Sequence, residues 1–454
     1  MGVRAARLVV VSVAVVIGTF VLRVRGIADH FLLLQDQIRD WGVALRPFSE
    51  LPLVGSPTHV GGYTVGPAFY WILWAIRVIV GPWFHNLPHA GGIGQAMLQS
   101  MADALLVVAI WKRAGSIWLA LATIVVLATA PFDLSIAAVV WNPVMGEILS
   151  KAAIALVLLG WPGRSMWRAA IVTAIAWSAV HAYTGAVFVA VSIFAAMVLQ
   201  SWMDEGARGA SRSAWLIAIV VVLLQVPYVV HRIEQKSEYG GMEAVSVSLT
   251  RVATGQDKTR FRDSATTYAA SVDSIEASPW SLKVPGLVLL VCGALLAGGY
   301  RRDPVLLMVA LAPQLLTIIG YAFWVGFLDS YYYLPILPAA IITVVLGLAA
   351  CLPARAARIA AVAMLACALA AVPSRVAAAH IFDMPAYRAL VKGSRALVGM
   401  GQPVRSIETS VPLPPNSDPT FIYKILGGRF DPESHSIAVI QPDGGVVFRR
   451  APGA

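Results

Sequence analysis

The sequence predicts an all-α polytopic membrane protein with about eleven transmembrane helices. Of its 454 residues, 58% are hydrophobic and only 13% are charged, whereas about a quarter of a soluble domain is charged. Apolar runs of about 20 residues, the length that crosses a bilayer as a helix, recur along the chain. Short clusters of arginine and lysine separate these runs. An ordinary soluble domain is therefore excluded.

The basic residues indicate membrane topology. The chain has 34 Lys and Arg against 24 Asp and Glu, a net charge of +10. Because they lie in short loops between apolar runs, they mark loops on the cytoplasmic side. We therefore expect membrane lipids as partners, and no nucleic acid. The three cysteines are odd in number and lie in or beside apolar stretches, so they predict neither a disulfide framework nor a metal cluster.

The first apolar run, Ala5 to Leu22, follows Arg4 and Arg7 and resembles a signal peptide. No small-x-small cleavage site follows it, so we interpret it as the first membrane span. The other ten expected spans are 95–111, 116–135, 143–160, 168–184, 186–201, 214–229, 284–299, 304–324, 333–350 and 359–377.

A twelfth apolar run, Tyr63 to Gly81, is ambiguous because Pro67 interrupts it and Arg77 lies near its end. If this run does not cross, the N-terminus and every short basic loop lie on the cytoplasmic side. We therefore expect a horizontal or re-entrant helix on the outer face.

This topology divides the chain into a transmembrane domain, 1–377, and an outer C-terminal tail, 378–454. Within the first domain, two long outer loops cover 23–94 and 231–283. The tail is rich in proline from Pro403 to Pro419, which predicts a linker. It then carries two apolar stretches around Asp443-Gly444-Gly445, which predict a small β-hairpin.

The first outer loop contains the run Asp36-Gln37-Ile38-Arg39-Asp40-Trp41. If this run is helical, its two carboxylates lie at i and i+4 on one face, with Arg39 alongside. A candidate base then lies beside a cation at the membrane surface. The alternative is a solvated interfacial helix whose charges pair locally.

Four glycines, among them Gly55 and Gly66, and three prolines lie between Leu51 and Trp71, a stretch that includes His59. Such a backbone can bend tightly and come close to a ligand. The alternative is a structured loop beside an interfacial belt of aromatic residues.

These runs, DQIRD at 36–40, LPLVGSP at 51–57 and GGYTVGPAFYW at 61–71, resemble the first periplasmic loop of bacterial GT-C glycosyltransferases. This group, glycosyltransferase family 39, is related to dolichyl-phosphate-mannose protein mannosyltransferases and aminoarabinose transferases. Three later places are similar: Trp141-Asn142-Pro143, His181-Ala182-Tyr183 and Tyr331-Tyr332-Tyr333. The resemblance covers most of residues 1–350 in order.

The resemblance implies a multi-pass enzyme of the bacterial inner membrane, with its N-terminus cytoplasmic and its C-terminus periplasmic. It implies transfer of a hexose or pentose, with inversion, from a polyprenyl phosphate to a lipid, glycan or protein acceptor. Asp36 matches the family's general base, and we place Asp40 with it in the catalytic site. The family also has a second acidic residue, near its third outer segment. Its counterpart here could be Asp133 or Glu147, which flank the Trp141 turn.

The chemistry agrees, since attack on an anomeric carbon needs a carboxylate to take the acceptor's proton. It also needs cations to hold the departing phosphate. Arg39 is one candidate, and the second outer loop supplies the others: His231, Arg232, Lys236, Arg251, Lys258, Arg260 and Arg262. The alternative for this cluster is contact with anionic lipid headgroups.

The remaining substrate-binding candidates are His59, Tyr63, Trp141, Asn142, Glu147, His181, Tyr183, Tyr331 and Tyr332. Glu147 lies at i,i+4 from Lys151 inside an apolar span, so the two could instead form a self-neutralising pair, and Asp103 in another span is expected to be structural. Tyrosines at the end of a span could equally be interface anchors. No cofactor is expected, because His59 and His181 lack close partners at ligand spacing; a divalent metal is the less favoured alternative.

A polytopic transporter or lipid and sugar flippase is the competing function. It would show pseudo-symmetric halves with broken spans at mid-membrane. The sequence shows no internal repeat, and its polar candidates lie mostly in two loops on one side. These features favour the enzyme, although they barely separate a monosaccharide transferase from a polymer ligase.

Overall fold

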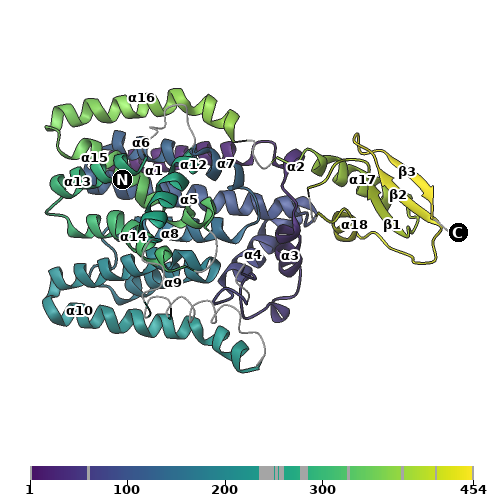
Figure 1. The fold of residues 1–454 in the computed structure, drawn as a ribbon, viewed down its shortest axis with the longest axis horizontal. Helices are drawn as coiled ribbons and strands as arrows, with labels where there is room; N and C mark the ends of the chain where they lie inside the picture. Colours follow the sequence, from purple (N-terminus) through teal and green to yellow (C-terminus); the bar gives the residue numbers. More distant parts are fainter. Residues whose placement is uncertain are drawn as a thin grey trace.

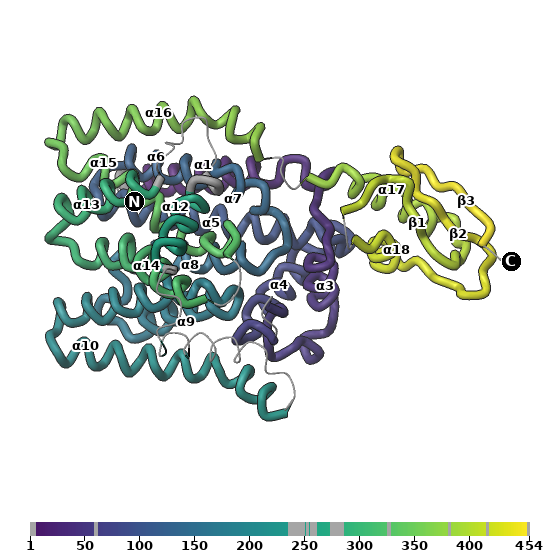
Figure 2. The backbone as a smooth tube through the Cα atoms, viewed as in Figure 1, coloured from purple at the N-terminus to yellow at the C-terminus, as the bar shows by residue number. Residues whose placement is uncertain are grey.

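The computed structural model describes residues 3–58, 62–234, 260–276, 285–324, 328–379, 383–414 and 417–451, together with residues 250 and 254. Helices form one large body, and a smaller part that ends in strands projects from one end of it (Figure 1). We call this smaller part, residues 383–414 and 417–451, the C-terminal segment. Helices α3 (Gln35–Ala44) and α4 (Ala68–Ile79) lie near the junction between the two parts (Figure 2).

The helices of the body are α1 (Val3–Val24), α2 (Ile27–His30), α3 (Gln35–Ala44), α4 (Ala68–Ile79), α5 (Pro88–Ala114), α6 (Ile117–Ala128), α7 (Pro131–Ile136), α8 (Asn142–Leu158), α9 (Met166–Ala182), α10 (Val187–Glu234), α12 (Arg260–Glu276), α13 (Pro285–Gly299), α14 (Pro304–Ala322), α15 (Leu337–Ala350) and α16 (Ala354–Ala378). A 3-10 helix, η4 (Ser330–Ile336), leads into α15. Helices α5, α8 and α15 form the core, since most of their residues are buried.

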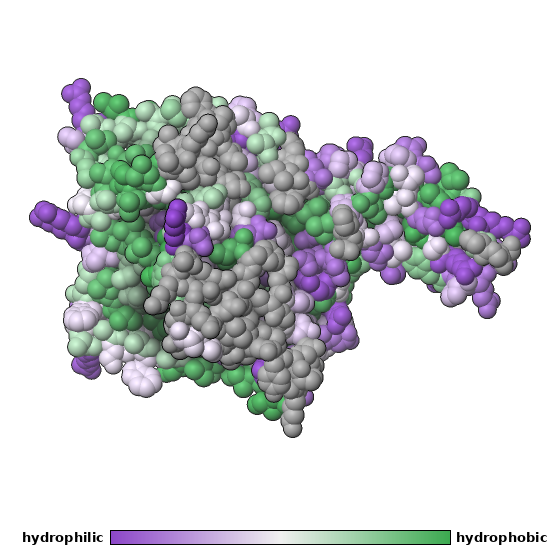
Figure 3. Space-filling view, viewed as in Figure 1, coloured by the Kyte–Doolittle hydropathy of each residue, from purple (hydrophilic) through white to green (hydrophobic). Residues whose placement is uncertain are grey.

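Six helices in the described residues are long and apolar enough to cross a membrane. They cover Ala6–His30, Pro88–Ala114, Thr184–Glu234, Pro304–Ala322, Ser330–Ala350 and Ala354–Ala378, and three shorter apolar helices accompany them. In Figure 3, hydrophobic residues gather on the side of the helical body away from the C-terminal segment. The chain is a multi-pass membrane protein, and the number of eleven spans stays a prediction.

The expected span 116–135 is wrong, because the structure divides it into α6 and α7. Pro131 begins α7, and a proline disfavours helical conformation in the residue before it. Ala130 accordingly has φ −55° and ψ 119°, outside the helical region.

Helix α4 has 12 residues, about 18 Å at 1.5 Å per residue. It is too short for a bilayer core of about 30 Å. This length supports the expectation that Tyr63 to Gly81 does not cross.

Helix α10 contains two antiparallel arms, which correspond to the expected spans 186–201 and 214–229. Gly206 has φ 64° and ψ −155°, which is not helical. Glycine adopts this conformation without steric cost. The chain reverses there, and the second arm runs back along the first (Figure 2).

The C-terminal segment contains α17 (Ala386–Met400), β1 (Ser406–Thr409), α18 (Thr420–Ile425), β2 (Ser436–Ile440) and β3 (Val446–Arg450). Strands β2 and β3 form the predicted hairpin, with Ile440 opposite Val446, and β1 pairs in parallel with β2. The expectation of a mere linker before this hairpin is wrong. Its proline-rich part includes β1, and α17 precedes it with one apolar face that contains Tyr387, Leu390 and Leu397.

Hydrogen bonds attach the C-terminal segment to the chain between α2 and α3. The backbone N–H of Met384 donates to the carbonyl of His30 at 3.0 Å, and the Ser417 hydroxyl donates to the carbonyl of Leu33 at 2.9 Å. The Tyr387 hydroxyl lies 2.9 Å from His89 Nδ1 at the start of α5. The segment therefore contacts both the helical body and the residues that lead into α3.

Candidate active site

Helix α3 carries the three charged residues predicted for the site. Its first turn is stabilised by Gln37, whose Oε1 accepts a hydrogen bond from the N–H of Leu34 at 3.1 Å. Arg39 contacts both carboxylates: its Nη1 donates to Asp36 Oδ1 and its Nε donates to Asp40 Oδ1, each at 2.8 Å. The predicted helix is confirmed, and the two carboxylates share one guanidinium.

The two carboxylates differ in accessibility. The side chain of Asp40 is 0% exposed, whereas that of Asp36 is 47% exposed. Tyr70 on α4 donates to Asp40 Oδ1 at 2.9 Å, and the Ser56 hydroxyl lies 3.3 and 3.4 Å from the two Asp40 oxygens. Burial raises the pKa of the Asp40 carboxyl, while Arg39 and Tyr70 act in the opposite direction. Asp40 is enclosed by protein groups, and Asp36 is the carboxylate that an incoming molecule can reach.

Gly55 and Gly66 lie close to His181 at the end of α9. A Cβ at Gly66 would overlap the ring of His181, and a Cβ at Gly55 would overlap the Thr64 hydroxyl. The sequence predicted that these glycines let the backbone approach a ligand. In the described residues they approach other parts of the chain instead.

The Trp141 turn lies next to α3. Gln37 Nε2 donates to the carbonyl of Val140 at 3.2 Å. Asn142 Nδ2 donates to the carbonyl of Ala182 at 3.1 Å, which joins the start of α8 to the end of α9. Three parts that were similar to the glycosyltransferase family, and that are far apart in sequence, therefore meet at one end of the helical body.

Four of the predicted residues form an aromatic wall, which we define as Trp141, Tyr183, Tyr331 and Tyr332. The rings of Tyr331 and Tyr332 are stacked with centroids 4.7 Å apart, and the Tyr331 centroid lies 4.9 Å from that of Trp141. Tyr183 closes the group, 6.2 Å from Tyr332. Val140, which accepts a hydrogen bond from Gln37 on α3, directly precedes Trp141. The wall therefore begins at a turn that contacts the helix carrying Asp36.

His181 lies two residues before Tyr183 of this wall and is 2% exposed. Its Nε2 makes no hydrogen bond with any residue in the described ranges. The ring of Tyr63 lies 6.2 Å from that of His231, near the end of α10.

The predicted phosphate-binding cations are only partly described. Lys236, Arg251 and Lys258 lie outside the described residues, as does the substrate-binding candidate His59, and Arg260 begins α12. Arg262 is exposed on the first turn of α12. Within the described part of the chain, no group of three His, Cys, Asp or Glu side chains is placed to hold a metal ion.

Helix α12 packs against α14 and against η4, the 3-10 helix that carries Tyr331 and Tyr332. Its Ser264 hydroxyl donates to the carbonyl of Ile318 at 2.7 Å. The ring of Tyr268 lies 5.5 Å from that of Tyr333 in η4. These contacts fix the start of α12, and with it Arg262, near the end of α14.

Glu147 belongs to a buried ion cluster, which consists of Arg23, Asp103, Asp133, Glu147 and Lys151. Every one of these side chains is 0% exposed. Lys151 Nζ lies 2.8 Å from Asp103 Oδ1 and 3.2 Å from Glu147 Oε1. These contacts agree with the alternative that Glu147 pairs with Lys151, while a structural role for Asp103 stays a prediction.

The cluster also includes Asp133, the other candidate for the second acidic residue. Arg23 contacts Asp103 and lies 3.6 Å from Asp133, while Gln99 Nε2 donates to Asp133 at 2.8 Å. The structure therefore places both Asp133 and Glu147 among protein partners inside the helical body.

Sequence reasoning missed Arg23, Ser56 and Tyr70. Arg23 ends an apolar run, and a charge at that depth signals a buried partner. Ser56 and Tyr70 lie within the stretches that resemble the family, but nothing in their spacing pointed to Asp40.

Two crystal structures of ArnT from Cupriavidus metallidurans resemble this chain. The apo structure has a TM-score of 0.55 at 14% identity and covers 94% of this chain and 86% of ArnT. The structure bound to undecaprenyl phosphate has a TM-score of 0.50 at 14% identity and covers 92% and 84%. An oligosaccharyltransferase from Archaeoglobus fulgidus has a TM-score of 0.47 at 13% identity, covering 92% of this chain and 62% of its own. Neither a protein-family model nor a curated protein matches the sequence. The likeness to ArnT shows a GT-C-like fold.

Proposed function

We propose that this protein is a membrane glycosyltransferase that moves a sugar from a polyprenyl phosphate to an acceptor at the periplasmic face, with inversion. The observation that carries the proposal is the position of Asp36. It is an accessible carboxylate on a helix that contacts the turn where the aromatic wall begins, at the end of a helical body whose fold resembles ArnT. One of the ArnT structures contains undecaprenyl phosphate, which supports a lipid phosphate as the carrier of the sugar.

Asp36 acts as the general base in this proposal. Its side chain is half-exposed, and only Arg39 holds it by an ion pair among the described residues. It takes the proton of the acceptor hydroxyl or amine as that atom attacks the anomeric carbon, and the bond from carbon to the phosphate oxygen breaks. A well-placed base contributes about 10² to 10⁴ in rate.

Asp40 positions Arg39 and does not touch the acceptor. Its burial and its contacts with Tyr70 and Ser56 hold one side of the guanidinium. Arg39 in turn fixes the orientation of Asp36. This division gives the two carboxylates different tasks, although the sequence placed both in one catalytic site.

The aromatic wall binds the apolar faces of the sugar or the first part of the lipid. Cations stabilise the negative charge that develops on the departing phosphate. Arg262 and Arg260 at the start of α12 are the candidates among the described helices, because α12 packs against η4. The Nε2 of His181, which has no hydrogen-bond partner among the described residues, supplies a further polar atom near this end.

The test compares lipid extracts from cells that lack the protein and carry one of four plasmids: wild type, Asp36→Asn, Asp36→Glu or Asp29→Asn. Asp29 is a matched control, because its side chain is 44% exposed and pairs with Arg388 at 3.4 Å. We expect a glycosyl polyprenyl phosphate to accumulate without the protein, measured by mass spectrometry. Wild type and Asp29→Asn should consume it, Asp36→Asn should not, and Asp36→Glu should do so in part. Full consumption by Asp36→Asn would contradict the role of Asp36.

A further inference from the structure

A pocket of about 470 Å³ lies at the end of the helical body farthest from the C-terminal segment (Figure 1). Three turns meet around it: α5 to α6, the end of α13, and α15 to α16. Its lining residues are Trp111, Ala114, Gly115, Ser116, Ile117, Trp118, Leu119, Tyr300, Ala349, Ala350, Leu352, Ala354, Ala357 and Arg358. The candidate active site does not include any of these residues.

The lining combines an apolar floor with aromatic residues at the mouth. Trp118 and Leu352 are 41% and 40% exposed, so the pocket opens to the surface. Tryptophan and tyrosine are typical of the level of lipid headgroups. Its volume lies in the range of about 300 to 1,000 Å³ that small-molecule sites occupy.

Arginines with no ion-pair partner among the described residues lie in the pocket lining and next to it in sequence. Arg358 lines the pocket, and Arg301, Arg302 and Arg355 lie within three residues of its lining on the same two turns. All four are exposed, and none forms an ion pair with a residue that the structure describes. Arg113 differs, because Asp303 binds it.

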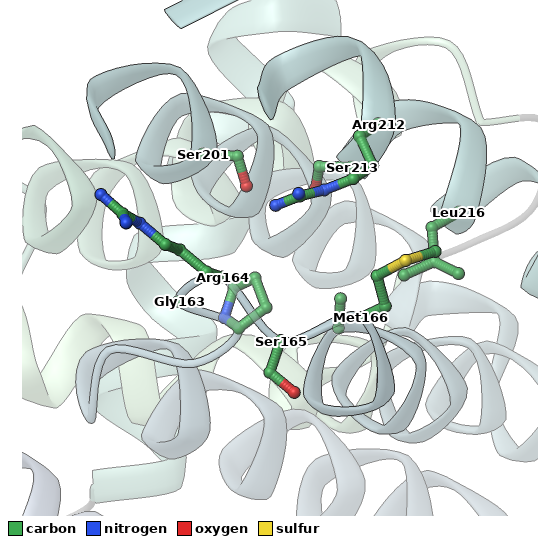
Figure 4. A pocket seen from close by; sticks show the side chains of 10 residues that line it. Gly163, Arg164, Ser165, Met166, Ser201, Arg212, Ser213 and Leu216 are labelled. Carbon is green, nitrogen blue, oxygen red and sulfur yellow. The ribbon is translucent and has the colours of Figure 1, made fainter. Parts of the chain in front are cut away.

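A second hollow at this end does not offer the same features. It lies between Pro162 and Leu216 and holds about 10 Å³, room for about one water molecule. Figure 4 shows Ser201, Arg212 and Ser213 on one side of it, with Ser165 and Met166 on the other. Its two arginines, Arg164 and Arg212, lie 3.8 and 2.9 Å from Glu205.

We propose that the 470 Å³ pocket binds one anionic glycerophospholipid from the leaflet at this end. The negatively charged phosphate of the headgroup contacts Arg358, and an acyl chain lies along the apolar lining between Trp118 and Leu352. Charge complementarity selects this occupant, because Arg358 lines the pocket and its lining residues include no Asp or Glu. Basic pockets between transmembrane helices on the cytoplasmic side recognise anionic headgroups in this way.

The experiment is native mass spectrometry of the delipidated full-length protein, titrated with phosphatidylglycerol or phosphatidylcholine of identical acyl chains. We expect phosphatidylglycerol to bind at least about fivefold more tightly, the effect of about one well-placed arginine. Arg358→Gln should abolish the preference. Arg168→Gln is the matched control, because that guanidinium lies at the same end over the Trp161 ring at 5.2 Å, and it should keep the preference.

A second measurement locates the lipid. Phosphatidylglycerol with brominated acyl chains should quench tryptophan fluorescence, and Trp118→Phe should remove part of that quenching. Ala357→Phe fills the pocket and should weaken binding, with gel filtration to check folding. Equal affinity for the two lipids, an equal loss with Arg168→Gln, or quenching unchanged by Trp118→Phe would each overturn the proposal. None of these readouts depends on glycosyltransferase activity.

Discussion

Replacement of Lys151 with methionine removes one of the two cations from the buried ion cluster. Its Nζ lies 2.8 Å from Asp103 and 3.2 Å from Glu147, and all three side chains are 0% exposed. The cluster then changes from two cations and three carboxylates, formally −1, to one cation and three carboxylates, formally −2. Removing one partner of a buried ion pair costs about 3 to 5 kcal/mol, because the other charge is left uncompensated. We expect the free energy of unfolding to fall by this amount.

The assay is unfolding of the purified protein in mixed micelles with increasing SDS, followed by tryptophan fluorescence. Lys112→Met is the control, since Lys112 is exposed at the end of α5, and its effect should stay within about 0.5 kcal/mol. Adding Asp103→Asn to Lys151→Met restores the formal charge of −1, so we expect it to recover about 0.5 to 3 kcal/mol. If Lys151→Met were as stable as Lys112→Met, the reasoning about the cluster would be refuted.

Three further predictions concern the hydrogen bond between α4 and Asp40, the close packing at Gly66, and the membrane topology. Tyr70→Phe removes the 2.9 Å hydrogen bond to Asp40. We expect the free energy of unfolding to fall by about 1.5 to 3 kcal/mol and hydrogen exchange in α3 to become faster. Unchanged exchange would argue against this contact. Gly66→Ala should reduce the yield of folded protein in gel filtration, because the added Cβ overlaps a ring, whereas Gly18→Ala, with nothing within 4 Å, should not. A single cysteine within 208–212, in a background without the native cysteines, should react with an impermeant maleimide only from the cytoplasmic side, and outside labelling would reverse the topology.

Local spacing predicted the helix of Asp36 and Asp40 because residues four apart on a helix share a face. It could not predict that one carboxylate would be buried. That burial depends on Ser56 and Tyr70, which are 16 and 30 residues farther along the chain. Their approach to Asp40 is set by how α4 packs, and spacing carries no information on packing.

The buried ion cluster shows the same limit over longer distances. Glu147 and Lys151 were predictable as a pair on one helix. Arg23 is 80 residues from Asp103, and only the packing of α1 on α5 brings them together. In the tail, the prolines from Pro403 onward dominated the prediction, so α17 was overlooked although its apolar residues recur at helical spacing.

The attachment of the C-terminal segment has a practical consequence for protein engineering. Truncation after the last membrane helix is a common way to simplify a membrane protein for biochemistry. Here it would delete the partners of His30 and Leu33, which lie just before the helix that carries Asp36. If a shortened protein lost activity, the cause could be the loss of these contacts to the first loop as readily as the absence of the C-terminal segment itself.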